Sequence, residues 1–251
     1  MQYKNLNIKW LGHSGFLIQF EGMNIYIDPI KLSNFDSKAD LILITHGHYD
    51  HCSVEDIRKI IKHGTKIIGP AEVLSQTRQI KDTVKTSVFP VSSNSIKAFE
   101  DGIDFEFAEA GKLFEKVLSK PGLLQESGKT INFNEITINC VDAYNINKPF
   151  HSKGDCVGYV IDFSGVKIYH AGDSDLIPEM KSIKTDIALL PVSGKFTMIA
   201  NEAVKAAEII HPDLAIPMHW GTIIGTLADA ERFVSLCKEK GINAVVMEKE
   251  I

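Results

Sequence analysis

The chain has 251 residues, of which 44% are hydrophobic and 24% charged, and its formal net charge is −5. This length suits one large domain or two small ones, and the composition excludes a collagen-like, low-complexity or disordered chain. No apolar run approaches the roughly 18–20 residues of a membrane span, so we expect no membrane association. The acidic balance weakly disfavours broad nucleic-acid binding.

The expected compartment follows from the N-terminus and the cysteines. The first ten residues lack the apolar core of a signal peptide, so we predict a cytoplasmic protein. The four cysteines form no CxxC pair and no dense framework, and we expect them to be reduced thiols. A homo-oligomer is possible, and the sequence does not indicate its size.

The chain opens with short apolar segments. Alternating and apolar runs predict strands around residues 8–11, 16–20 and 23–27, separated by turns. The wholly apolar run at residues 41–44 is typical of a strand that is buried on both faces. These strands precede the first helix signal, so the first half of the chain begins as a sheet.

A helix and a further strand–helix pair are expected next. Ser53 and Asp56 form a capping box, which predicts a helix from residue 54 onward. Residues 66–70 are a strand-like run closed by a turn signal. A second helix is expected from about residue 71 to residue 80.

The segment at about residues 92–133 fits this pattern worst, and we predict an inserted helix and loop there. Its large apolar residues at partly helical spacing are Phe105, Phe107, Phe114 and Leu118. The insertion is expected to cover a sheet edge or to form a subunit contact. A lid over the substrate is the alternative.

The order of elements then recurs. Residues 15–22 match residues 158–165, and residues 39–44 match residues 185–190. Chance similarity between two hairpins is the alternative, but the hairpin and the later strand recur in the same order. Two similar β-rich halves predict an α+β fold, a four-layer αββα sandwich in a single domain over residues 1–251. Its site should lie at the seam between the halves.

The second half ends with helices around a strand. We expect a helix over residues 201–210, because its apolar side chains share one face. An apolar strand follows at residues 214–218, and a final helix covers residues 227–240 before Gly241.

The central motif is Thr45-His46-Gly47-His48-Tyr49-Asp50-His51, which lies between a buried strand and a capped helix. His46 and His48 can point to one side as a pair. Asp50 and His51 can serve a second point a few ångströms away. Imidazole and carboxylate ligands suit zinc, with manganese or iron as alternatives, so the motif predicts two divalent metal ions.

Two metal ions need more ligands than one loop offers, including a bridging oxygen. Asp173 follows a strand that the repeat equates with the strand ending at Asp28, and it is the natural bridging carboxylate. Its alternative role is to cap the next turn. His219 directly follows an apolar strand and precedes a glycine turn, so we predict that it is a ligand rather than a structural histidine.

The third ligand of the metal held by His46 and His48 should lie between the loop and Asp173. His151 is the candidate histidine in that interval. Asn145 follows the preceding strand more closely, but amide oxygens are poor zinc ligands beside imidazole. We therefore favour His151 and keep Asn145 as a neighbour of the site.

These residues resemble the metallo-β-lactamase superfamily of metal-dependent hydrolases. The resemblance is carried by the histidine loop, by Gly172-Asp173 and by Pro217-Met218-His219. The segments 11–16 and 169–173 narrow it to the branch that contains L-ascorbate-6-phosphate lactonase and many hydrolases of unknown substrate. It covers nearly the whole chain except about residues 92–133. Its motifs are specific for the fold and the metal site but not for the substrate.

The resemblance implies a ligand set. One metal would be held by His46, His48 and a mid-chain histidine, and the other by Asp50, His51 and His219, with Asp173 bridging. Relatives commonly have a histidine where this chain has Asn145. Either His151 has taken over that role or the first metal is weakly held, so a mononuclear enzyme remains an alternative.

The reaction that the resemblance implies is hydrolysis of a small ester, lactone or phosphoester by a metal-activated water. Asp50 would orient the nucleophile as well as bind metal, which makes it the catalytic candidate. Candidates for contacts around the metals or with substrate are His13, Asp28, Asn145, His170 and Lys195. Among these, Asp28 is expected to orient a ligand histidine, and Lys195 could contact an anionic substrate.

Three other functions compete with this one. Processing of nucleic acids occurs in the same superfamily, but the net charge of −5 disfavours it. Redox chemistry at a di-iron centre is disfavoured because relatives of that type carry a glutamate where His48 stands and append a flavin domain. The third is a non-enzymatic metal-dependent sensor or scaffold. It stays an alternative because Asn145 stands where relatives commonly have a ligand histidine.

Overall fold

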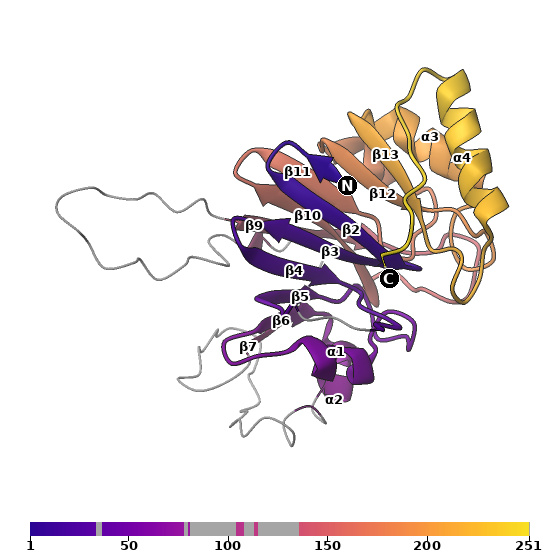
Figure 1. Ribbon diagram of the computed structural model, residues 1–251. Coiled ribbons are helices and arrows are strands. Elements are labelled where there is room, and N and C mark those ends of the chain that lie inside the picture. The colour runs from indigo at the N-terminus through magenta and orange to yellow at the C-terminus, as the bar shows by residue number, and fades with distance from the viewer. Residues whose placement is uncertain (34–36, 78–79, 81–103, 108–112, 115–135, 251) are drawn as a thin grey trace.

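The computed structural model describes residues 1–33, 37–77, 80, 104–107, 113–114 and 136–250. These residues form two mixed β-sheets packed against each other, with helices on the outer sides (Figure 1). The arrangement is an α+β sandwich, as the sequence predicted. Within the described residues, no helix is long and apolar enough to cross a membrane.

The first sheet has seven strands in chain order. They are β1 (Gln2–Tyr3), β2 (Leu6–Gly12), β3 (Gly15–Phe20), β4 (Met23–Ile27), β5 (Leu41–Leu43), β6 (Lys66–Gly69) and β7 (Asp104–Phe107). Strands β1 to β4 pair antiparallel, and β4 to β7 pair parallel. Since parallel neighbours end at the same edge, the loops after β4 and β5 lie close together.

The second sheet has six strands in the order β13-β12-β11-β10-β9-β8. Their bounds are β8 (Leu113–Phe114), β9 (Ile136–Ala143), β10 (Cys156–Phe163), β11 (Val166–His170), β12 (Ile187–Pro191) and β13 (Leu214–Met218). Strands β8 to β11 pair antiparallel, and β11 to β13 pair parallel. An antiparallel hairpin followed by a parallel strand therefore occurs in both sheets, as the internal repeat predicted.

Helices lie outside each sheet. They are α1 (Val54–Ile60), α2 (Ala71–Thr77), the 3-10 helix η2 (Pro178–Ser182), α3 (Ala200–Ile210) and α4 (Leu227–Glu239). The side chain of Ser53 caps α1 by accepting a hydrogen bond from Asp56 N, as predicted, but the Asp56 carboxylate accepts from Ser53 Oγ instead of completing the capping box at the Ser53 backbone. α3 and α4 lie together outside β12 and β13 (Figure 1).

One apolar core joins the two sheets. Its buried side chains come from both, among them Phe20 of β3 and Phe163 of β10, whose rings meet at 5.5 Å between centroids. A second core fills the space between the first sheet and α1, with Ile42 and Ile57 buried. Each fully buried large apolar side chain contributes about 1.5–3 kcal/mol, so these two cores hold the strand ends at fixed positions.

The predicted inserted helix is wrong where the structure describes it. Phe105 and Phe107 belong to β7, which extends the first sheet beside β6, and Phe114 belongs to β8. The Asp-Phe-Glu-Phe alternation has the two-residue period of a strand, which the partly helical spacing to more distant residues obscured. The rest of segment 92–133, with Leu118, lies outside the described residues.

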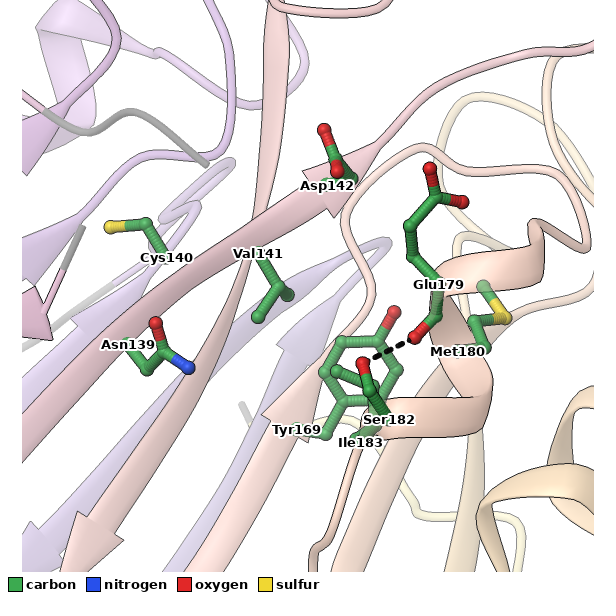
Figure 2. Close-up of a pocket in the computed structure, with 9 residues that line it drawn as sticks. All are labelled: Asn139, Cys140, Val141, Asp142, Tyr169, Glu179, Met180, Ser182 and Ile183. Atoms are coloured by element: carbon green, nitrogen blue, oxygen red, sulfur yellow. Dashed lines mark hydrogen bonds between the residues drawn. The ribbon is translucent and has the colours of Figure 1, made fainter. Parts of the chain in front are cut away.

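The outer face of the second sheet carries a small cavity. It has a volume of about 240 Å³ and lies between β9, β11 and η2 (Figure 2). Tyr169 is fully buried beneath it, and Ser182 Oγ donates to the Glu179 carbonyl oxygen over 2.7 Å at its rim. None of the histidines of the central motif lines this cavity, so their chemistry belongs to another part of the molecule, the strand ends.

Candidate metal centre

Four loops bring the predicted ligands together. The motif loop follows β5 in the first sheet, and Asp173 and His219 follow β11 and β13 in the second. His151 lies in the connection between β9 and β10. All four loops belong to one end of the sandwich, because ends of parallel strands share an edge.

The first group of donors consists of three imidazoles. His46 Nε2 lies 3.0 Å from His48 Nδ1, and His151 Nε2 lies 3.2 Å from the same atom. His151 Nε2 is also 3.4 Å from Asp173 Oδ2. His46 and His151 are buried, whereas His48 faces solvent. Three imidazole nitrogens and one carboxylate oxygen thus converge at the exposed side of the site.

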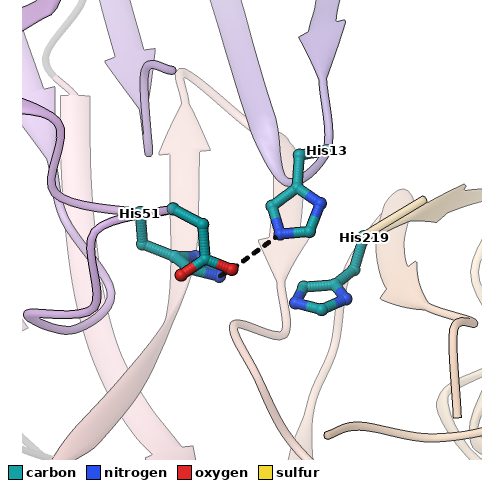
Figure 3. Close-up of side chains that lie close together, drawn as sticks. His13, His51 and His219 are labelled. Carbon is teal, nitrogen blue, oxygen red and sulfur yellow. Dashed lines mark hydrogen bonds and ion pairs between the residues drawn. The ribbon is translucent and has the colours of Figure 1, made fainter. Parts of the chain in front are cut away.

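The second group lies deeper. His51 Nε2 is 3.3 Å from Asp173 Oδ1, and His219 Nε2 is 3.0 Å from Asp173 Oδ2. Asp50 Oδ2 approaches His51 Nε2 at 3.8 Å. Figure 3 shows the rings of His13, His51 and His219 turned toward one another. Asp173 therefore lies between the two groups, with its Oδ2 near both His151 and His219 and its Oδ1 near His51.

The outward-facing nitrogens of two motif histidines, His46 and His51, are anchored. His51 Nδ1 lies 2.7 Å from Asp28 Oδ2, a carboxylate that also accepts hydrogen bonds from Thr45 N and Thr45 Oγ1. His46 Nδ1 lies 3.0 Å from Thr45 Oγ1. Because an acceptor on Nδ1 keeps the proton there, Nε2 of each ring offers its lone pair to the centre.

The two later histidines have anchors of their own. Asn145 Oδ1 lies 3.0 Å from His151 Nδ1 and also accepts from His151 N at 3.2 Å. Ser193 Oγ lies 2.7 Å from His219 Nδ1. Asn145 is thus placed as a partner of His151. This arrangement agrees with the preference for the histidine over the amide as a ligand.

The donor set suits a divalent cation. Three buried atoms, His51 Nε2, His219 Nε2 and Asp173 Oδ1, have no hydrogen-bond partner among the residues that the structure describes. They lie on the inner side, where lone pairs converge. Leaving such atoms unsatisfied in the interior costs about 1–3 kcal/mol each. A bound cation would satisfy all three, so the residues present fit a metal.

The chain is similar to known metal-dependent hydrolases. Residues 7–219 match the model of the beta-lactamase superfamily domain. The UPF0173 metal-dependent hydrolase of Methanopyrus kandleri is 30% identical over 96% of both chains, and that of Thermoplasma acidophilum is 31% identical over 98% of this chain and 97% of its own. The chain belongs to the UPF0173 metal-dependent hydrolases of the metallo-β-lactamase superfamily.

Solved structures place the hydrolase among the same proteins. A putative metal-dependent hydrolase from Parabacteroides distasonis is 25% identical, with a TM-score of 0.72 over 98% of this chain and 94% of its own. The metallo hydrolase Igni18 from Ignicoccus hospitalis is also 25% identical, with a TM-score of 0.68 over 98% and 96% of the two chains.

Two carboxyl groups at the candidate metal centre of this metal-dependent hydrolase, those of Asp173 and Asp50, are ionised. Burial favours protonation of Asp173, but the charges of His219 and His51 outweigh it and keep the pKa of that carboxyl well below its usual range. Burial likewise opposes ionisation of Asp50, yet the hydrogen bond from His13 and the charge of His51 lower its pKa to about 2. Both side chains are therefore carboxylates, which is the form that binds cations.

Not every predicted neighbour reaches the centre. His13 does, because its Nε2 lies 3.1 Å from Asp50 Oδ2. His170 instead points to the Ser14 carbonyl oxygen at 2.9 Å and accepts from Gly172 N, so it supports the turn before Asp173. Lys195 is exposed, with its ammonium 5.0 Å from the centre of the Phe196 ring.

The backbone is strained at the site. Asp28, His13 and His219 have φ angles of 44°, 55° and 60°, and all three are fully buried. Such left-handed conformations are costly for residues with a side chain, at about 1–3 kcal/mol each, and they concentrate at functional sites. His13 is held in this form because its carbonyl oxygen accepts hydrogen bonds from Trp10 Nε1 and His219 N.

Three residues of the centre were not assigned these roles from the sequence. Thr45 and Ser193 anchor histidines, and their hydroxyl groups give no spacing signal that would have indicated it. Cys156 lies within 4.8 Å of donor atoms of His46 and His151. Burial raises the pKa of its thiol well above the usual value, so the protonated side chain is a poor ligand.

Proposed function

We propose that the hydrolase holds two divalent cations, most readily zinc, and cleaves a small ester, lactone or phosphoester. The observation that supports it most is the position of Asp173, whose Oδ2 lies 3.4 Å from His151 Nε2 and 3.0 Å from His219 Nε2 and whose Oδ1 lies 3.3 Å from His51 Nε2, so that the carboxylate stands between the two sets of imidazoles. A carboxylate between two sets of donors is the bridging arrangement that two-metal hydrolytic sites require. Manganese or iron are the alternative metals.

The residues would divide into two sets that share one bridge. We assign His46, His48 and His151 to the first cation. Asp50, His51 and His219 are assigned to the second. Asp173 belongs to both. Asp28, Asn145, Thr45 and Ser193 would keep four of the imidazoles in the tautomer that presents Nε2 inward.

When bound, the cations supply Lewis-acid polarisation of the scissile bond and lower the pKa of a water molecule. Asp50 is the catalytic candidate among the chain's own groups, since its carboxylate is ionised and lies at the edge of the cluster. His13 holds Asp50 Oδ2 at 3.1 Å, and Asp50 Oδ1 would accept a hydrogen bond from the attacking water molecule and orient it. Lys195, exposed two residues after the His219 anchor Ser193, is a candidate contact for an anionic substrate group.

The test combines metal analysis with a substrate panel. We expect about two zinc or manganese ions per chain, and fewer in His48→Ala. The variant His63→Ala, an exposed histidine outside the cluster, serves as the matched control. Metal-loaded protein is then assayed on lactones, carboxylic esters and phosphodiesters. One tightly bound ion per chain would contradict the binuclear proposal.

The same panel tests the alternatives. Cleavage of bis-p-nitrophenyl phosphate without cleavage of any lactone or ester would favour a phosphodiesterase, which includes enzymes that process nucleic acids. Metal binding without turnover of any substrate class would favour a sensor or scaffold. The resemblance to the L-ascorbate-6-phosphate lactonase branch makes phosphorylated lactones the first compounds to try.

A further inference from the structure

Large apolar side chains are exposed on segments that carry or adjoin the candidate ligands. In the part of the chain that the structure describes, eight large apolar side chains are exposed, and six of them lie on or beside the loops that carry candidate ligands or their anchors. These six are Tyr49, Ile146, Phe150, Ile199, Ile223 and Leu227. Single exposed apolar residues are ordinary, but several of them on the segments that carry the candidate ligands point to a binding surface there.

Phe150, on one of these segments, forms a fixed aromatic pair with Phe196, which we call the Phe150–Phe196 wall. Phe150 directly precedes His151, and its ring meets that of Phe196 edge to face, with 4.6 Å between centroids. Asn145 Nδ2 donates to the Phe196 carbonyl oxygen over 2.9 Å, so the side chain that anchors His151 also fixes this second loop. The aromatic pair is therefore held at a set position beside a candidate ligand.

One of the two lysines next to the wall is paired with a carboxylate. Lys148, on the same loop as Phe150, pairs with Asp175 and donates to the Thr197 carbonyl oxygen at 2.9 Å. Lys195 extends over the Phe196 ring. Phe150 is nevertheless 44% exposed, so an apolar surface faces solvent within one residue of the centre.

We propose that the Phe150–Phe196 wall binds an apolar acyl or aryl group of the substrate, next to the bond that is cleaved. This inference rests on the proposed hydrolytic function and adds the class of group that the substrate carries. A substrate is the favoured occupant because the wall continues directly into the metal centre through His151 and Asn145. An apolar group seated there gains about 25 cal/mol per Å² that it removes from water.

Binding of metal-chelating probes tests this without turnover. Acetohydroxamate and octanohydroxamate share one chelating head and differ in the apolar tail, and their affinities for the metal-loaded protein are measured by calorimetry. We expect octanohydroxamate to bind at least about tenfold more tightly to the wild type. In Phe150→Ser and in Phe196→Ser, that advantage should fall below about threefold. Val245→Ser, an exposed apolar residue beside Ala215, should retain it.

Several outcomes would overturn the proposal. Equal affinity for both probes in the wild type would do so, as would a tail advantage that survives in both wall variants. Loss of self-association in those variants, with the tail advantage unchanged, would assign the wall to a contact between copies of the chain. A protein that hydrolyses no ester, lactone or phosphoester but keeps a wall-dependent tail advantage would contradict the proposed function alone.

Discussion

At the scale of single residues, the centre is defined by what holds its imidazoles. His51 is anchored by a buried carboxylate, His151 by an amide, and two further rings by hydroxyl groups. Hydrogen bonds to an ionised partner are about twice as strong as those between neutral groups. His51 is therefore the most firmly oriented donor, and the orientation of His151 depends on a weaker neutral contact.

This difference makes Asn145 a sensitive position. In Asn145→Ala, His151 loses its acceptor at Nδ1 and the loop loses its contact with the Phe196 carbonyl oxygen. We expect the affinity for one of two cations to fall by about 10–100-fold, as is usual when the partner of a ligand histidine is removed. Metal titration with a competing chelator measures it.

Two further variants separate orientation from general damage to the loop. Asn145→Asp keeps an acceptor for His151 Nδ1 and should recover most of the metal affinity. Asn147→Ala, an exposed position on the same loop, should have the metal affinity of the wild type. Equal metal affinity in Asn145→Ala and Asn147→Ala would contradict the assigned role.

The sequence indicated the donors better than their anchors. His46, His48, Asp50 and His51 lie within six residues of one another, so their spacing alone predicts a shared loop. The anchors come from distant positions: Asp28 lies 23 residues from His51. Asp28 was nevertheless expected to orient a ligand histidine, whereas the hydroxyl anchors Thr45 and Ser193 were not, because a hydroxyl group gives no spacing signal.

At the scale of elements, the turn after β11 sets the position of Asp173. Gly172 has a φ of 61°, and a Cβ atom there would lie 2.7 Å from the Val157 carbonyl oxygen. Because that neighbour is backbone, it cannot move aside cheaply. We expect Gly172→Ala to lower the free energy of unfolding by about 2–3 kcal/mol, in a urea titration, and to weaken metal binding.

Gly165→Ala is the matched control. Gly165 also has a positive φ, of 94°, but a Cβ atom there would meet nothing within 4 Å. It should show only the conformational penalty, about 1 kcal/mol, with metal binding unchanged. If both variants lost the same stability and both bound metal normally, the contact with Val157 would not matter.

The start of α1 is held by one carboxylate. Asp56 accepts hydrogen bonds from Lys31 N at 2.7 Å, Leu32 N at 3.0 Å and Lys59 Nζ at 2.9 Å, besides its contact with Ser53. Burial favours its protonation, but these donors outweigh it and lower the pKa of Asp56. We expect Asp56→Ala to cost about 2–3 kcal/mol at pH 7, measured by urea unfolding.

The pH dependence of that loss follows from the direction of the shift. A lowered pKa in the folded state contributes stability above the unfolded value near about pH 4, and this contribution disappears as the pH falls through the folded value. The difference between wild type and Asp56→Ala should therefore narrow below about pH 4. Glu55→Ala, at an exposed neighbouring position, should match the wild type throughout. A difference that is constant from pH 3 to 7 would show that the charge of Asp56 plays no part.

Elements with strong local signals were predicted well. The strand at residues 214–218 has the predicted bounds, and α3 and α4 differ from the prediction by one residue at one end. Strand β7 was missed because a four-residue run stabilised by pairing with β6 carries little signal of its own. Short sheet strands depend on tertiary contacts, whereas capped helices are indicated locally.

At the scale of the whole molecule, the repeat explains why the site lies at a seam. The carboxylate after β4, Asp28, holds His51 at Nδ1, and the carboxylate after β11, Asp173, lies 3.3 Å from Nε2 of the same ring. His51 thus lies between corresponding strand ends of the two halves. The candidate ligands come from loops of both sheets, so a bound cation would connect one sheet to the other.

This connection predicts that the metals stabilise the fold as a whole. A ligand that binds only the folded state at about 1,000 times its dissociation constant adds about 4 kcal/mol, which is about 10 °C in Tm for a chain of this size. We expect chelation to lower the Tm by at least this amount in calorimetry, and zinc to restore it. His48→Ala, which removes an exposed donor of one group, should show a smaller difference between the two forms. An identical Tm with and without metal would mean that the cations do not join the two sheets.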